Sequence, residues 1–97
     1  MEKKFDIVVT RHPALLEYLK MMNMLAEDAK VLKHAEAEDV RGKHVCGVLP
    51  HSLSSLTASF TEIPLKVPPE LRGRELSLYD IYRYAGKPVT YIVRKIS

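Results

Sequence analysis

The chain has 97 residues and a formal net charge of +3; 46% of its residues are hydrophobic and 28% are charged. These values are ordinary for a globular protein, so we expect one domain spanning residues 1–97. The basic residues are spread along the chain and Trp is absent, which disfavours a long nucleic acid as partner. No apolar run approaches the roughly 20 residues that span a bilayer, and no signal-peptide core follows the first residues. A cytoplasmic protein without membrane contact is therefore expected.

The first predicted element is a short apolar strand at residues 5–10. Pro13 suits the first turn of a helix, because its missing N–H has no partner there in any case. The helix that follows is predicted from apolar residues at helical spacing, namely Leu15, Leu16, Leu19, Met22 and Leu25. Residues 31–32 form a weaker strand candidate, which completes a strand–helix–strand unit.

The middle of the chain begins with a charged turn at residues 36–43 that opens with a short helical piece. A strand at residues 44–49 follows. Cys46, the only cysteine, lies in this buried-strand pattern, which indicates a small core residue rather than a nucleophile. After the strand, Leu53, Leu56 and Phe60 repeat with the spacing of a helix stripe.

The last third of the chain is predicted as strand, loop, helix and strand. A strand at residues 61–67 contains Pro64, which favours an edge position or a bulge. Ser77 is the expected N-cap of a helix over residues 78–85, although Asp80 stands where a capping box usually has Glu. Gly86 fits a helix stop, and residues 89–96 form the last strand.

Strands and helices thus alternate along the whole chain. Alternation of this kind predicts an α/β fold, here a small Rossmann-like domain. We expect about five mainly parallel strands with helices on both faces of the sheet.

Thr10, Arg11 and His12 lie where the first strand ends and the first helix begins. Open α/β sheets bind their ligands outside the carboxyl ends of their strands. An arginine fork, an imidazole and a helix N-terminus together favour an anionic ligand such as phosphate. A solvated turn is the alternative interpretation of the same three residues.

A second histidine, His51, also stands at a strand-to-helix junction, in the run Val48-Leu49-Pro50-His51-Ser52. If the first and third strands are neighbours at a switch point, His12 and His51 approach each other across one crevice. Ser52 by itself is typical of a helix cap, and His51 is equally compatible with an exposed position and with a ligand contact.

The loop before the last helix contains Arg72-Gly73-Arg74-Glu75, which suits either a mobile phosphate clamp or a solvated loop with weak ion pairs. The remaining histidines, His34 and His44, are interpreted as structural or exposed, and Lys33 as part of a solvated face. Neither a metal-ligand spacing nor a glycine-rich dinucleotide fingerprint nor a P-loop occurs, so no metal and no cofactor is predicted.

Three motifs together resemble a known family: V-V-T-R-H-P near the start, G-V-L-P before the second helix and L-R-G-R-E-L-S before the third. They are similar to the sixteenth family of the CRISPR-associated Csx series, small accessory proteins of type III CRISPR loci. The resemblance covers nearly the whole chain. It implies a Rossmann-like fold similar to CARF domains, and a homodimer that binds cyclic tetra-adenylate across its two-fold axis.

The resemblance also implies a ring nuclease, which degrades this cyclic oligoadenylate messenger and switches off antiviral signalling. The implied site consists of Thr10, Arg11, His12 and Pro13 in the first motif, Leu49 and Pro50 in the second, and Arg72, Arg74 and Glu75 in the third. Ala14 stands where many relatives have glycine, which puts main-chain contacts to phosphate in question.

Ring cleavage would need no metal, because a ribose 2′-hydroxyl can attack the adjacent phosphate and leave a 2′,3′-cyclic phosphate. In this hypothesis Arg11 stabilises the developing charge, and His12 or His51 transfers the proton. Thr10 and Ser52 position the ring, while Arg72 and Arg74 close over it. The alternative is a binding module that sequesters the cyclic nucleotide, or passes the signal to a partner, without cutting it.

Overall fold

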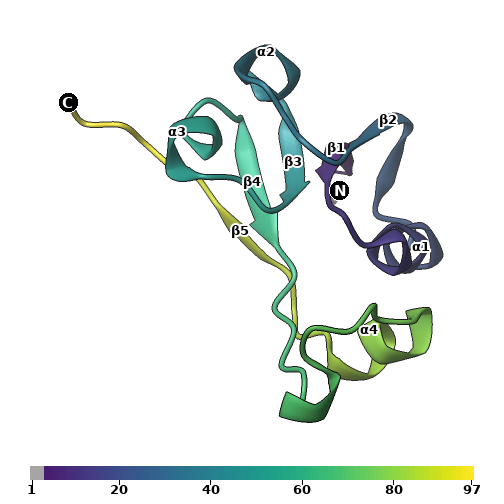
Figure 1. Cartoon of the computed structure of the whole chain (residues 1–97). Coiled ribbons are helices and arrows are strands. Elements are labelled where there is room, and N and C mark those ends of the chain that lie inside the picture. The colour runs from purple at the N-terminus through teal and green to yellow at the C-terminus, as the bar shows by residue number, and fades with distance from the viewer. Residues whose placement is uncertain (1–3) are drawn as a thin grey trace.

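A computed structural model describes residues 4–97 and contains one five-stranded sheet with the strand order β2-β1-β3-β4-β5 (Figure 1). The strands are β1 (Phe5–Val9), β2 (Leu25–Leu32), β3 (His44–Gly47), β4 (Ser59–Glu62) and β5 (Val89–Tyr91). All neighbouring strands are parallel except β5, which is antiparallel to β4. The predicted α/β class with about five mainly parallel strands is confirmed.

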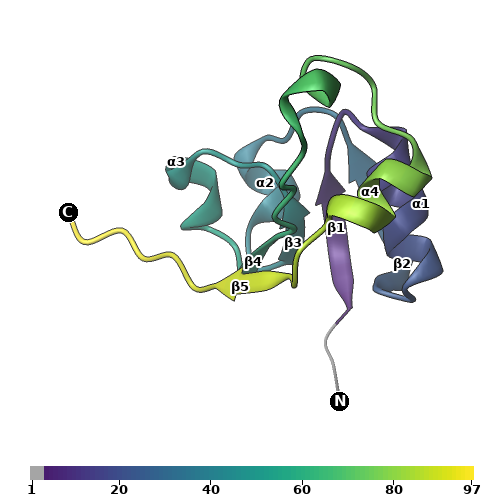
Figure 2. The same cartoon turned by 90° about the horizontal axis from the view of Figure 1, so that it is seen from below.

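Four short α-helices and one 3-10 turn connect the strands. They are α1 (Pro13–Met21), α2 (Ala37–Val40), α3 (His51–Ser54), the 3-10 turn η1 (Pro69–Leu71) and α4 (Leu78–Tyr84). Helices α1 and α4 lie on one face of the sheet, and α2 and α3 lie on the other (Figures 1 and 2). The expectation of helices on both faces is therefore confirmed.

Each face of the sheet has its own apolar core, as expected for parallel strands that are covered on both sides. On the first face, Val8 and Cys46 pack with Leu19 of α1 and Ile81 of α4. On the second face, the core contains Ile7, Val9, Val40 and Val45. The thiol of Cys46 is buried as predicted, and burial raises its pKa to about 12.

Helix α1 ends at Met21, four residues before the predicted limit at Leu25. Asn23 adopts a left-handed conformation with φ 56°, which asparagine tolerates better than most residues. Its N–H donates to the Lys20 carbonyl at 3.0 Å, and the Met24 N–H donates to the Leu19 carbonyl at 2.9 Å. These two bonds form a Schellman motif. The chain then turns into β2, so Leu25 begins a strand much longer than the predicted residues 31–32.

The helix predicted from Leu53, Leu56 and Phe60 is wrong in its extent, because α3 contains only residues 51–54. The side-chain hydroxyls of Ser54, Ser55 and Thr57 donate to carbonyls three residues earlier, which competes with continuation of a helix. Phe60 belongs to β4. The apolar stripe nevertheless packs on a single core, the one on the α2–α3 face.

The prediction of an edge position or a bulge at Pro64 is also wrong, because β4 lies between β3 and β5, pairs with both without a register shift, and does not contain Pro64. The strand begins at Ser59 and ends at Glu62, before the proline that could not donate to a ladder. The neighbouring strands are shorter than predicted as well: β3 stops at Gly47 and β5 at Tyr91.

The start of α4 follows the prediction closely. The Asp80 N–H donates to Ser77 Oγ at 3.1 Å, and the Ser77 N–H donates to Asp80 Oδ2 at 3.0 Å. Aspartate therefore completes the capping box that usually has glutamate. The helix ends at Tyr84, and Gly86 lacks the positive φ of a glycine helix stop; its N–H instead donates to the Pro64 carbonyl at 2.7 Å.

Candidate functional site

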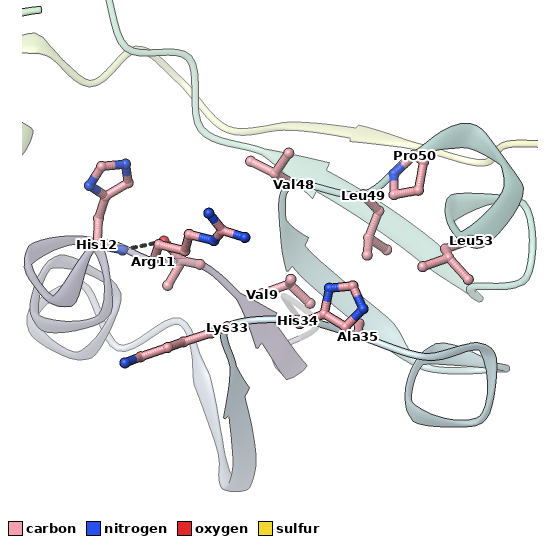
Figure 3. Close-up of a pocket in the computed structure, with 11 residues that line it drawn as sticks. Val9, Arg11, His12, Lys33, His34, Ala35, Val48, Leu49, Pro50 and Leu53 are labelled. Atoms are coloured by element: carbon pink, nitrogen blue, oxygen red, sulfur yellow. Dashed lines mark hydrogen bonds between the residues drawn. The ribbon is translucent and has the colours of Figure 1, made fainter. Parts of the chain in front are cut away.

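The carboxyl ends of β1, β2 and β3 surround a hollow of about 380 Å³, which we call the switch-point pocket (Figure 3). β1 lies between β2 and β3, so the chain passes from β1 to its neighbour β2 on one side, and then crosses back to β3 on the other side. A reversal of this kind opens a crevice at the strand ends, where α/β proteins bind ligands. The pocket is lined by Val9, Thr10, Arg11, His12, Lys33, His34, Ala35, Val48, Leu49, Pro50 and Leu53.

A close approach between β1 and β3 shapes one wall of the pocket. Gly47 has φ 134°, and a Cβ at this position would overlap the Val9 carbonyl oxygen. The following Val48 N–H donates to that same oxygen at 3.2 Å. Only glycine permits both the backbone angle and the contact. The turn Val48-Leu49-Pro50 is therefore held directly beside the end of β1.

The wall on the β1 side is a short turn built around Thr10. Its N–H donates to the Leu32 carbonyl at 2.9 Å, which extends the pairing of β1 with β2 by one residue. Its hydroxyl accepts a hydrogen bond from the His12 N–H at 3.0 Å (dashed in Figure 3). His12 is the N-cap of α1, and Pro13 follows at the first helical position. Arg11 is exposed between these fixed neighbours.

The charged side chains that line the pocket are all basic. Arg11 and Lys33 are cations, and His12 and His34 are imidazoles, whereas no lining residue within the described range 4–97 is acidic. Glu36, outside the lining, pairs with one of them: its Oε1 lies 3.7 Å from His34 Nε2, and both side chains are about four-fifths exposed (80% and 79%). The floor is apolar, with Val9 and Leu49. This distribution suits an anion that has an organic part.

The basic side chains do not all point the same way (Figure 3). Arg11 extends toward the turn at Val48, and the His34 ring lies above the floor near Leu49. The His12 ring and the Lys33 ammonium point outward, away from the floor. Arg11 and His34 thus face the interior of the pocket, while His12 and Lys33 stand at its rim.

Other residues predicted for the site lie elsewhere. His51 lines a separate hollow with Glu62 and Tyr91, so His12 and His51 do not share one crevice in this structure. Ser52 is exposed inside α3, and the helix cap predicted for it is wrong, because Pro50 occupies the N-cap position.

The third motif lies on the connection between η1 and α4. Arg72 and Arg74 are exposed there. Glu75 lines a shallow hollow against Pro13 and Ala14 at the start of α1. The motif therefore reaches the N-terminus of α1, at the edge of the sheet where the carboxyl end of β1 also lies (Figure 2).

Sequence reasoning missed Lys33 and His34 as pocket residues. Both follow the last residue of β2 directly, in the same position that Thr10 and Arg11 occupy after β1. The predicted strand at residues 31–32 already ends at Leu32, so the rule that singled out Thr10–His12 could have found them. The pairing of β2 with β1, which brings Lys33 and His34 beside Arg11, is not visible in the local pattern.

Residues 4–97 contain no group of three or more His, Cys, Asp or Glu side chains that could hold a metal ion. Within the same range, none of the helices combines the length and the apolar character needed to cross a membrane.

A family model described as "Putative CRISPR-associated protein (Cas_VVA1548)" matches residues 7–94, which is most of the chain. No curated protein and no solved structure matches it. The match includes every residue of the switch-point pocket and all three motifs.

Proposed function

The chain belongs to this family of CRISPR-associated proteins, and on that premise we propose that it binds a cyclic oligoadenylate, cyclic tetra-adenylate in particular, in the switch-point pocket. One observation carries the proposal: Arg11, Lys33 and two histidines line a pocket at the strand ends whose described lining has no acidic residue. Clustered cations raise the local concentration of a polyanion and neutralise its phosphates. Arg11 supplies a planar fork that can hold two oxygens of one phosphate.

The size of the pocket favours a dimer. Its volume of about 380 Å³ lies near the lower end of the range of about 300–1,000 Å³ that is typical of small-molecule sites. A ring of four nucleotides with four phosphates exceeds such a space, so one copy covers only a part of it. We propose a CARF-like homodimer that presents the same surface twice to a ligand that has rotational symmetry itself.

We further propose that the protein is a metal-independent ring nuclease of type III CRISPR signalling. The ribose 2′-oxygen forms a bond to the adjacent phosphorus, and the bond from phosphorus to the 5′-oxygen breaks. One imidazole accepts the 2′-hydroxyl proton, and the leaving 5′-oxygen takes up a proton from water. His12 and His34 are the histidines of the pocket lining, and Arg11 would stabilise the charge that develops on phosphate.

A binding module that sequesters the ring uncut is the second candidate. It is favoured by the orientation of His12, whose ring points away from the pocket floor, so that of the two lining histidines His34 alone faces the interior (Figure 3). A general base must come within hydrogen-bond reach of the proton that it removes. A protein that only grips phosphate has no such requirement.

Product analysis separates the two candidates. Pure protein is incubated with cyclic tetra-adenylate and EDTA, at excess and at substoichiometric enzyme, and the products are separated by chromatography. Multiple turnovers to linear di-adenylate with a 2′,3′-cyclic phosphate support the nuclease. An intact ring that co-migrates with the protein supports sequestration, and an intact ring that remains free contradicts both.

The Arg11→Ala variant shows which interaction is lost. A nuclease should lose rate more than affinity, whereas a sequestering protein should lose affinity alone. Lys20→Ala is the matched control, because Lys20 is an exposed cation at the far end of α1. If Lys20→Ala weakens binding as much as Arg11→Ala, general charge rather than the pocket attracts the ring.

A further inference from the structure

A second hollow of about 360 Å³ adjoins the switch-point pocket and shares Val48 and Leu49 with it. We call it the side hollow. It lies where α3, β4 and β5 meet, and its other walls include Phe60, Tyr91 and Glu62. The turn Val48-Leu49 that follows β3 therefore forms a wall common to the two hollows.

The chemistry of the side hollow differs from that of its neighbour. Glu62 brings a carboxylate, which repels phosphate and accepts hydrogen bonds from amines. Tyr91 is 44% exposed, and its hydroxyl donates to Glu62 Oε1 at 3.5 Å. Phe60 and Leu49 add apolar surface. An aromatic ring beside an acceptor on an apolar wall suits a flat base that carries an amine.

We propose that the side hollow is a nucleobase subsite, which takes an adenine of the same ligand whose phosphate lies in the switch-point pocket. The inference rests on the proposed function. The base stacks on the Tyr91 ring, as bases do on exposed aromatic side chains. The exocyclic amine of adenine donates to the Glu62 carboxylate, an acceptor type that proteins use for amino groups of bases.

The position of His51 supports this division between phosphate and base. His51 lines the side hollow and not the switch-point pocket. It begins α3, directly after the turn that separates the two hollows. His51 therefore contacts the base side of the ligand, and proton transfer at phosphate belongs to the histidines across the turn.

The test compares two ligands and four variants, Arg11→Ala among them, by equilibrium titration with 2′-deoxy rings, which lack the attacking hydroxyl and stay uncut. Cyclic tetra-adenylate is compared with cyclic tetra-inosinate, in which a carbonyl replaces the amine. Wild type should bind the adenine ring about tenfold more tightly, because the carbonyl meets the Glu62 carboxylate. Glu62→Gln should reduce this preference to about twofold or less, since an amide can donate to the carbonyl. Tyr91→Leu should weaken binding of both rings about fivefold or more through lost stacking.

Tyr82→Leu is the matched control, because Tyr82 is an exposed tyrosine (63%) on α4 and lines neither hollow. It should leave both affinities unchanged. If wild type binds both rings equally, and Glu62→Gln and Tyr91→Leu bind like wild type while Arg11→Ala does not, the subsite is refuted and the proposed function stands. If wild type binds neither ring, both proposals fall. The comparison of ligands on wild type needs no variant to fold.

Discussion

Replacing Gly47 by alanine tests the reasoning about how β1 and β3 meet. Gly47 has φ 134°, which L side chains rarely adopt. The new Cβ would lie 2.8 Å from the Val9 carbonyl carbon and 3.0 Å from the Val9 nitrogen, and it would overlap the carbonyl oxygen. All three atoms belong to the backbone of Val9 at the paired end of β1, so a side-chain rotation cannot relieve the overlap.

The cost of Gly47→Ala follows from two terms. A non-glycine residue in a glycine region costs about 1–3 kcal/mol. Separating the strands also removes the hydrogen bond from the Val48 N–H to the Val9 carbonyl, worth about 1 kcal/mol. The free energy of unfolding should therefore fall by about 3 kcal/mol. For a domain of this size each kcal/mol lowers Tm by about 4–8 °C, so a decrease of about 12–24 °C is expected.

Thermal unfolding followed by circular dichroism measures this decrease. Gly86→Ala is the control, because Gly86 lacks a positive φ and its Cβ would meet Pro64 Cβ at an ordinary 3.5 Å. Its Tm should stay within a few degrees of wild type. If Gly47→Ala also melts within a few degrees of wild type, the strands do not meet as described, and the wall of the switch-point pocket is wrong.

Three smaller predictions concern stability and reactivity. Ser77→Ala should lower the free energy of unfolding by about 1 kcal/mol in a denaturant titration, because it breaks the reciprocal cap with Asp80; an unchanged midpoint would contradict the cap. Because burial raises the Cys46 pKa from 9.0 to about 12, the folded thiol should resist iodoacetamide at pH 8 until denaturant is added. Its contribution to stability should be complete below pH 9.0 and should decline between pH 9.0 and about 12, where only the unfolded thiol ionises. Glu38→Gln should change stability by less than about 1 kcal/mol, since its 3.7 Å pair with Arg41 is exposed; a larger loss would show a role beyond this pair.

The fold class was predictable because apolar runs and breaks alternate clearly along the chain. Element limits were predicted less well, for reasons that lie in single residues. The α1 stripe continues through Met22 and Leu25, but Asn23 turns the backbone into the left-handed region. Periodicity alone also assigned Phe60 to a helix, although it reaches the same core from β4. An apolar side chain can pack in the same core from a helix or from a strand, so the spacing of apolar residues does not distinguish the two.

The site residues that follow β1 were predicted from the sequence. Those that follow β2 were missed, because their place in the site depends on the pairing of β2 with β1. Arg11 and His12 follow a strand that is recognisable in isolation. Lys33 and His34 follow β2, a strand with exposed charged residues whose pairing with β1 is a long-range fact. The separation of His51 from His12 depends on the turn after Gly47, which the contact with Val9 fixes in place. A rule that considers only where each strand ends cannot predict this contact.

The most direct test of the central claim is an amide chemical-shift titration of isotope-labelled protein with cyclic tetra-adenylate. We predict shifts concentrated at the carboxyl ends of β1, β2 and β3, in residues 9–12, 33–35 and 48–53, with salt weakening the effect as expected for phosphate contacts. Shifts concentrated instead at the opposite edge, around His44, Ser59 and Thr90, would contradict the claim. A spectrum unchanged by excess ligand would contradict it as well.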